Sequence, residues 1–259
     1  MPSKKAHLPQ SEAGWLETGK FEVEMVAVGG NQIRCAFVKG THGSRLVTMV
    51  GGIPRDPERQ KNLPLINKLY GHLAGIMEVF GISSLLYNQP ATGGSTGTWD
   101  KETLQSRTET LAGLVDHFSR RMRFSDHALL GTSAGAYMAI SAIRQIRDRR
   151  DKISMLLLLS PAAYPTVVET VPYGERFTQL IREPWDVATS PIFPKLRRFS
   201  ESGGSLLLSY FEADDPPIPL YIQEYYTNFV RKLSEERADA TVMTIPSVAH
   251  NFRRMHRSK

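Results

Sequence analysis

The sequence HALLGTSAGAYMAISAI, from His127 to Ile143, decides how the rest of the chain is interpreted. It begins with a short apolar run that predicts a strand, and from Ala134 onward its small and apolar residues predict a buried helix. The connection between them, GTSAG, fits the pattern G-x-S-x-G. Glycines two residues before and after a serine allow a strand and a helix to pass close together around a sharp turn. We therefore expect Ser133 to stand at a strained turn, with its hydroxyl clear of the sheet.

Strands and helices alternate on both sides of this turn. The apolar patterns predict strands over residues 21–28, 32–38, 45–50, 83–87, 127–131, 153–160, 205–211 and 240–245, and helices over residues 63–79, 103–121, 134–147 and 221–233. The first two strands flank Gly29-Gly30-Asn31, a hairpin signal, whereas most later strands follow a helix. This order predicts the α/β class, with an open and mostly parallel sheet flanked by helices.

Two segments depart from the alternation. Residues 1–19 are polar and without periodicity, which predicts a flexible N-terminal arm in front of one domain that spans residues 20–259. Residues 161–204 contain six prolines and many large apolar side chains. Because an exposed loop would leave those side chains in water, we expect this segment to form a small insertion, or lid, over the sheet.

The composition is that of an ordinary globular domain. The chain has 259 residues, of which 41% are hydrophobic and 22% are charged, and this excludes collagen-like, coiled-coil and wholly disordered chains. A single cysteine, Cys35, cannot form a disulfide within the chain. The first twenty residues lack the apolar region of a signal peptide, and no apolar run is long enough to span a membrane. We therefore expect a cytoplasmic protein without membrane insertion.

The formal net charge of +6 is concentrated in arginine-rich stretches such as residues 144–150 and 253–259. Aspartates interrupt the first stretch, and no aromatic residues alternate with the arginines as they do on surfaces that stack nucleic-acid bases. We therefore expect no nucleic-acid partner. Solvated helix ends account best for these charges, with a functional anionic partner as the alternative.

Ser133 is a candidate nucleophile, and the N–H of Ala134 at the start of the helix would face charge that develops on a substrate oxygen. A serine needs a base, and in enzymes with this turn the nucleophile, the acid and the histidine follow one another along the chain. Only His250 and His256 follow Ser133, and His250 is our candidate because it comes shortly after the last strand. Ser95 also fits G-x-S-x-G, but no strand leads directly into it, and a glycine-rich loop is the better interpretation.

The acid should lie between the serine and the histidine, just after a strand, where it can orient the imidazole. The segment that follows the strand at residues 205–211 offers three carboxylates, those of Glu212, Asp214 and Asp215. We choose Asp214 and keep Asp215 as the alternative.

Taken together, these motifs resemble those of the α/β-hydrolase superfamily over residues 21–252. The segment LVTMVGGIPRD is similar to the loop after the third strand, and the resemblance implies that Gly52 or Ile53 supplies a first oxyanion N–H beside that of Ala134. IPSVAHNF resembles the histidine loop, and FEADDPPIP resembles the acid loop G-E-x-D-x-x-x-P. In the acid loop, the G-E-x-D part matches Asp214, whereas the distance to the proline matches Asp215.

One loop departs from the superfamily pattern. SSLLYNQPATGGSTG is similar to the loop after the fourth strand, which usually reads D-x-R-G-x-G-x-S, but Asn88 and Pro90 replace the acid and the arginine. The resemblance also places lids where residues 161–204 stand. The large side chains of this segment either pack against the sheet or line an acyl pocket above Ser133, and the pocket candidates are Trp185, Phe177 and Tyr164.

The resemblance implies a serine hydrolase that cleaves a small-molecule acyl ester or thioester through an acyl-enzyme on Ser133. His250 would be the general base and acid, oriented by Asp214 or Asp215. No nucleotide-binding fingerprint or metal-ligand cluster is visible, so we expect no cofactor and no metal. An acyltransferase with the same triad and a non-catalytic small-molecule binder are the alternatives. The leaving group, the acyl chain length and the oligomeric state, a homodimer included, stay open.

Overall fold

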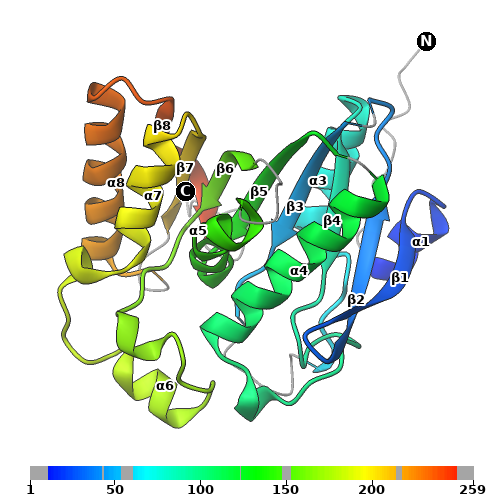
Figure 1. The fold of residues 1–259 in the computed structure, drawn as a ribbon, viewed down its shortest axis with the longest axis horizontal. Coiled ribbons are helices and arrows are strands. Elements are labelled where there is room, and N and C mark those ends of the chain that lie inside the picture. Colours follow the sequence, from blue (N-terminus) through cyan, green and yellow to red (C-terminus); the bar gives the residue numbers. More distant parts are fainter. Residues whose placement is uncertain are drawn as a thin grey trace, which may run out of the picture.

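An eight-stranded sheet organises the molecule (Figure 1). The structure, a computed structural model, describes residues 11–42, 44–53, 61–122, 124–147, 153–213 and 218–249. The strands are β1 (Glu22–Val28), β2 (Asn31–Val38), β3 (Arg45–Val50), β4 (Ser83–Tyr87), β5 (Asp126–Thr132), β6 (Ile153–Leu159), β7 (Ser205–Ala213) and β8 (Ala240–Ala249). Their order across the sheet is β1-β2-β4-β3-β5-β6-β7-β8.

The sheet is parallel except at one end. The pairs β1–β2 and β2–β4 are antiparallel, whereas β4, β3, β5, β6, β7 and β8 run parallel to one another. The hairpin between β1 and β2 turns at Gly29 and Gly30, whose positive φ angles of 58° and 82° favour glycine at both positions. The predicted α/β class with an open, mostly parallel sheet is therefore confirmed.

Helices cover both faces of this sheet. They are α1 (Glu12–Glu17), α3 (Lys68–Val79), α4 (Leu104–Met122), α5 (Ala134–Arg147), α6 (Glu175–Leu180), α7 (Ile192–Glu201) and α8 (Leu220–Glu235). Short 3-10 helices lie at Trp99–Lys101, Thr166–Val168 and Val187–Thr189. Side chains of α4, α5, α7 and α8 form one buried apolar cluster, and those of α1 and α3 form a second.

Strand β3 shows how one sequence serves both clusters. Leu46 and Val50 belong to the cluster of α4 and α5, whereas Val47 and Met49 belong to the cluster of α1 and α3. Successive side chains of a strand point to opposite faces, so a central strand covered on both sides is apolar throughout. The same rule explains why β4 and β6 carry apolar residues on both faces.

The N-terminal segment differs from its prediction. The expectation of a flexible arm is wrong for residues 11–19, because α1 forms there, with the Ser11 side chain accepting a hydrogen bond from the Gly14 N–H. Trp15 is 3% exposed and packs so tightly over Gly71 that a Cβ there would overlap with the indole ring. Burial of this ring stabilises the docking of α1 on α3. Residues 1–10 lie outside the described residues.

Several element boundaries also differ. Helix α3 begins at Lys68 instead of residue 63, because Asn67 caps it by accepting a hydrogen bond from the Tyr70 N–H at 2.9 Å. Strands β7 and β8 continue to Ala213 and Ala249, and the two terminal residues are themselves paired. Both strands therefore extend past the point where their apolar patterns end.

Residues 161–204 cross from the end of β6 to the start of β7 and carry α6 and α7 (Figure 1). Helix α7 buries Ile192, Phe193, Leu196 and Phe199 in the cluster of α4 and α5. The search for membrane-spanning helices, limited to the described residues, finds none that is long and apolar enough.

Candidate active site

Ser133 stands alone between β5 and α5. Its φ of +53° is unusual for a residue with a side chain, and such backbone strain is concentrated at functional sites. Its N–H donates to the carbonyl of Leu159 at 3.0 Å, which fixes the turn to the end of β6. Its carbonyl accepts from the N–H groups of Ala136 and Ala162, at 3.0 and 3.2 Å. The strand, the strained turn and the helix expected from the sequence are all present.

The two glycines of the motif are required by close backbone contacts. A Cβ on Gly131 would overlap with the backbone of Ala136, and a Cβ on Gly135 would overlap with the carbonyl oxygen of Val50. The first contact lets α5 fold back over β5, and the second lets α5 pass against the end of β3. The pattern G-x-S-x-G is therefore a packing requirement of this turn.

The loop after β3 lies directly beside Ser133. A Cβ added to Gly52 would stand 3.2 Å from the Cβ and 3.7 Å from the Oγ of Ser133. On the other side, Ala134 begins the fourteen-residue helix α5, and the N–H groups of a first helical turn have no carbonyl partner within the helix. Of the two residues expected in the β3 loop, Gly52 lies beside Ser133, and Ile53 is half-buried against the cluster of α4 and α5.

Tyr70 is a neighbour of this site that sequence analysis did not identify. Its hydroxyl lies 2.7 Å from the Oγ1 of Thr132 and 3.3 Å from the carbonyl oxygen of Val50. Burial raises the pKa of Tyr70 to about 12, and the hydrogen bond with Thr132 opposes this shift only in part. No sequence signal marks this tyrosine, because it occupies an ordinary apolar position at the start of a helix.

The acid and base candidates cannot be placed. Asp214, its alternative Asp215 and His250 lie outside the described residues. The structure does describe the strand ends that precede them: Ala213 of β7 pairs with Ala249 of β8 in a parallel ladder. The chain thus reaches Asp214 and His250 from two neighbouring residues.

Ser95, the other serine in a G-x-S-x-G pattern, has a different environment. Its hydroxyl donates to the carbonyl of Asn88 at 3.0 Å and accepts from the N–H of Arg34 at 2.9 Å. The first bond closes the glycine-rich loop after β4 on itself, and the second holds this loop against β2. The amide of Asn88, which replaces the acid usual in the superfamily, donates to the Leu63 carbonyl.

Two of the three pocket candidates, Tyr164 and Phe177, belong to a row of aromatic side chains. Tyr164 contacts Tyr137 of α5, one helical turn beyond Ser133, with ring centroids 5.2 Å apart. Phe177 packs against Tyr164 and Tyr173 and is only 7% exposed. Trp185 is half-buried against the cluster of α4 and α5.

Polar contacts anchor residues 161–204 to α5. The hydroxyl of Tyr137 donates to Glu169 at 2.9 Å, and Lys195 approaches the same carboxylate at 3.5 Å. Lys195 also donates to Ser141 of α5 at 3.2 Å. The segment is therefore fixed to the helix that begins at the candidate nucleophile.

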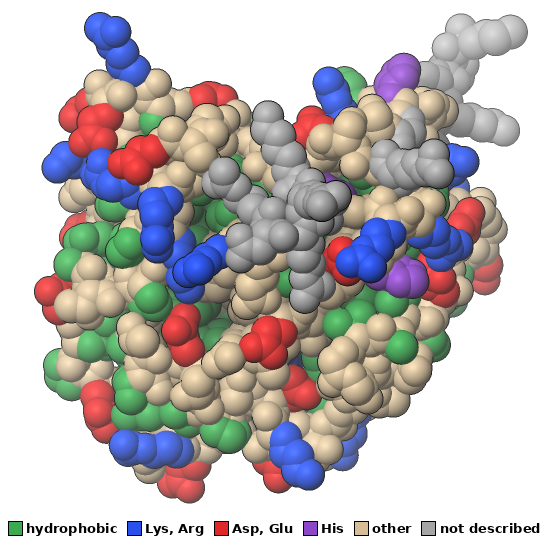
Figure 2. All heavy atoms as spheres, viewed as in Figure 1, with side chains coloured by type: hydrophobic (Ala, Val, Ile, Leu, Met, Phe, Trp, Pro, Cys, Tyr) green, Lys and Arg blue, Asp and Glu red, His purple; other side chains and the backbone are tan. Residues whose placement is uncertain are grey.

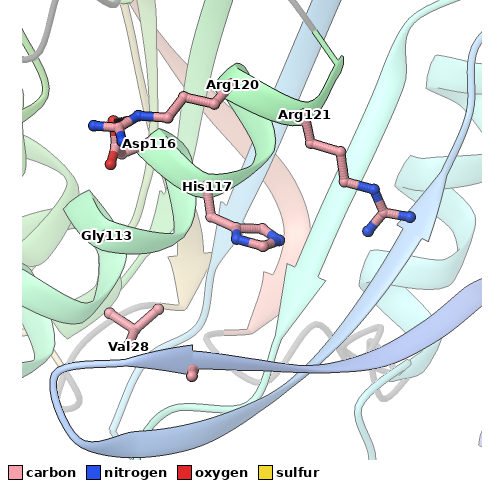
Figure 3. Close-up of a pocket in the computed structure, with 7 residues that line it drawn as sticks. Val28, Gly113, Asp116, His117, Arg120 and Arg121 are labelled. Carbon is pink, nitrogen blue, oxygen red and sulfur yellow. Dashed lines mark hydrogen bonds and ion pairs between the residues drawn. The ribbon is translucent and has the colours of Figure 1, made fainter.

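A groove away from this site lies between β1 and α4 (Figure 3). Its volume is about 640 Å³, and it is lined by Ala27, Val28, Gly113, Asp116, His117, Arg120 and Arg121. The two arginines are paired with carboxylates, Arg120 with Asp116 and Arg121 with Glu24. None of the site candidates that the structure describes lines this groove. On the face drawn in Figure 2, Lys and Arg side chains are interspersed with Asp and Glu.

Metal binding has no candidate in the part of the chain that the structure describes, where no three His, Cys, Asp or Glu side chains gather to hold an ion.

Comparison with known proteins identifies the architecture. No protein-family model matches the sequence, and no curated protein does. Among solved structures, 621 chains match. Est1E from Butyrivibrio proteoclasticus with ferulic acid bound has 16% sequence identity and a TM-score of 0.64, and the alignment covers 88% of this chain and 91% of that one.

Two further structures agree with this result. An α/β serine hydrolase without a lid from Xanthomonas campestris has 16% identity and a TM-score of 0.59, covering 90% of this chain and 87% of that one. An α/β serine hydrolase homologue from Coxiella burnetii has 16% identity and a TM-score of 0.58, covering 88% of each chain. At such identities the similarity establishes the fold alone. The chain has the α/β-hydrolase fold.

Proposed function

We propose that this protein is a serine hydrolase that cleaves a small-molecule acyl ester or thioester through an acyl-enzyme on Ser133. The observation that carries the proposal is the close approach of the loop residue Gly52 to a strained Ser133, at φ +53°. A serine held in this way beside backbone N–H groups fits acyl transfer, in which the nucleophile and the oxyanion donors must both lie about 3 Å from the reacting carbonyl group. Est1E, with its bound ferulic acid, supports a small organic acid as the acyl group.

In this mechanism the Oγ of Ser133 attacks the acyl carbonyl carbon, and the hydroxyl proton passes to the imidazole of His250. The carbonyl oxygen becomes an oxyanion that accepts hydrogen bonds from the N–H of Ala134 and from that of Gly52 or Ile53. Collapse of the tetrahedral intermediate breaks the bond to the alcohol or thiol, which takes the proton from His250. Water then attacks the acyl-enzyme by the same steps and releases the acid.

The acid is Asp214 in our proposal, with Asp215 as the alternative. The pairing of Ala213 with Ala249 supports the assignment, because it brings the chain to Asp214 and to His250 from adjacent strand ends. A carboxylate beside the imidazole would hold the correct tautomer and stabilise the imidazolium that forms during attack.

Residues 161–204 are proposed to cover the acyl group as a small lid, with Tyr164, Phe177 and Trp185 lining the pocket. The contact of Tyr164 with Tyr137 supports this role, because Tyr137 lies on the helix that starts beside the nucleophile. Hydrophobic walls of this kind would select among acyl chains by length.

Hydrolysis of p-nitrophenyl esters and acyl thioesters of graded chain length tests the proposal. Ser133→Ala should lower kcat on the order of 10³-fold or more, while Ser95→Ala, the matched control, should keep most of the activity. Near-wild-type turnover by Ser133→Ala would overturn the assignment. A folded wild-type protein that turns over no member of the series would favour a binder, and product formation that requires an added alcohol or amine acceptor would favour an acyltransferase.

A further inference from the structure

We propose that Tyr70 is a positioning residue that holds the oxyanion loop, residues 51–53, at its working distance from Ser133. The inference rests on the proposed function and names a residue that determines how well the same site works. It starts from the place of the tyrosine hydroxyl, which contacts the backbone of one arm of the site and a side chain of the other.

The two arms lose their regular pairing at this point. The parallel ladder between β3 and β5 ends with the pair Val50 and Gly131. Beyond it lie Gly51 and Gly52 on one arm and Thr132 and Ser133 on the other. The Tyr70 hydroxyl lies where the ladder ends and connects Val50 to Thr132. It therefore joins the residues that immediately precede the oxyanion loop and the nucleophile.

One arrangement of hydrogen bonds satisfies the Tyr70 hydroxyl, the Thr132 hydroxyl and the Val50 carbonyl together. A carbonyl can only accept, so Tyr70 donates its single proton to Val50 and accepts one from Thr132. Donors and acceptors linked in such a chain polarise and strengthen one another. Because burial raises the pKa of Tyr70 to about 12, the hydroxyl keeps its proton at any ordinary assay pH.

The ring of Tyr70 adds a steric constraint to the hydrogen bonds. It is 7% exposed, and a Cβ on Gly51 would stand 3.7 Å from both the Cε2 and the hydroxyl of Tyr70. The ring is therefore in contact range of Gly51, and Gly135 at the start of α5 faces the carbonyls of Val50 and Gly51. The loop therefore contacts the tyrosine at Gly51 and the start of α5 at its carbonyl oxygens.

The hydrogen bonds of Tyr70 matter because catalysis tolerates only small changes in the distances between reacting groups. Oxyanion donors act within about 2.7–3.1 Å of the oxyanion, and a misplacement of about 1 Å can cost on the order of 10²-fold in rate. Tyr70→Phe removes the hydroxyl and keeps the ring, so it releases the loop without opening a cavity. We expect it to lower kcat about tenfold or more while KM stays within about twofold.

The experiment compares Tyr70→Phe, Thr132→Val and the double variant with the wild-type protein. Active sites are counted by complete titration with a fluorophosphonate, so that kcat refers to folded protein alone. Thr132→Val should lower kcat by a similar factor. The double variant should have the same kcat as either single variant, because all three variants break the same chain of hydrogen bonds. Thr132→Ser keeps the hydroxyl and should restore kcat to near the wild-type value.

Two further measurements separate positioning from a structural role. Tyr87→Phe is the control, since Tyr87 is also 7% exposed and its hydroxyl accepts a hydrogen bond from Gln89, and its kcat should be unchanged. A boronic acid that forms a tetrahedral adduct on the serine should bind Tyr70→Phe more weakly by the same factor by which kcat/KM falls.

The inference is overturned if Tyr70→Phe titrates fully and keeps kcat within about twofold of the wild type, or if the losses of Tyr70→Phe and Thr132→Val multiply in the double variant. If Tyr70→Phe does not fold, the contrast between Thr132→Val and Thr132→Ser decides, and equal kcat values for these two would overturn it. Failure of the proposed function is seen separately, in a wild-type protein that neither reacts with the fluorophosphonate nor turns over substrate.

Discussion

The Cα of Gly135 faces the carbonyl oxygen of Val50 so closely that any Cβ on residue 135 would overlap with that oxygen. This contact lets the first turn of α5 lie against the end of β3. It brings the turn that carries the candidate nucleophile next to the loop that carries its candidate oxyanion donors. The site therefore depends on a missing side chain as much as on those that are present.

Gly135→Ala should destabilise the protein by about 3 kcal/mol, because the added methyl meets rigid backbone that cannot move aside. Gly75→Ala is the matched control. Gly75 lies within α3, and a Cβ there meets nothing within 4 Å, so the alanine should stabilise the helix by about 0.5–1 kcal/mol. Urea unfolding of both variants measures the difference. A Gly135→Ala protein as stable as the wild type would contradict the packing described for this turn.

Much of the fold could be predicted from the sequence, because the spacing of apolar residues and the local composition determine where strands and helices form. Apolar runs placed β3, β4, β5 and β6 to within two residues at either end, and the glycine spacing around Ser133 predicted the strained turn. Helix α1 was missed because its six residues contain only one side chain, that of Trp15, that is buried. Its stability comes from the contact of Trp15 with Gly71, which no local pattern reveals.

The site itself was harder to predict completely. Residues such as Ser133 and Gly52 stand in recognisable spacings, whereas the role of Tyr70 depends on the distances from its hydroxyl to Val50 and Thr132. Those distances follow from how α3 packs on the sheet. Val50 and Thr132 are 20 and 62 residues away from Tyr70 along the chain, so no local sequence pattern predicts these contacts.

His127 should make the stability depend on pH. It is 1% exposed at the start of β5, and burial lowers its pKa from 6.5 to about 4, against a smaller opposing effect of Asp126. The unfolded chain therefore binds a proton between about pH 6.5 and pH 4 while the folded protein does not. This contribution to stability is complete above pH 6.5 and falls as the pH decreases, by about 3 kcal/mol at pH 4.

Urea unfolding at pH 7 and pH 4.5 of the wild type and of His127→Gln tests this prediction. The wild type should lose about 2–3 kcal/mol more than the variant between the two pH values. His117→Gln, on the exposed face of α4, should behave like the wild type. Equal losses in the wild type and His127→Gln would mean that other groups cause the pH dependence.

Trp185→Ala should change the preference for acyl chain length. The ring is half-buried, and each methylene that a pocket accommodates is worth about 1–3 kcal/mol, so the ratio of kcat/KM for long and short chains should shift about tenfold. Phe177→Ala is the less direct test, because this 7% exposed ring also supports Tyr164 and Tyr173, and its removal should cost about 3–5 kcal/mol of stability.

Val167→Ala is the control for this series, since Val167 lies in the same segment and is 58% exposed. It should keep the wild-type preference. If Trp185→Ala and Phe177→Ala both fold and every chain length keeps its wild-type ranking, residues 161–204 are structural cover and the acyl pocket lies elsewhere.

Asp214→Ala and Asp215→Ala should differ sharply in rate. Removal of the carboxylate that orients His250 should lower kcat on the order of 10⁴-fold, because the imidazole then adopts the wrong tautomer. Replacement of the other aspartate should leave kcat nearly unchanged and should affect little more than the stability of a turn. We expect the large loss at Asp214. A large loss at Asp215 alone would exchange the two assignments, and equal, modest losses would mean that neither is the triad acid.

The residue with which a fluorophosphonate reacts tests most directly whether Ser133 is the nucleophile. Peptide mass mapping of the labelled wild-type protein should find a single adduct, on Ser133, and labelling should disappear in Ser133→Ala while Ser95→Ala labels as the wild type does. An adduct on Ser95, or labelling that persists in Ser133→Ala, would contradict the claim that the strained turn beside Gly52 holds the nucleophile of this protein.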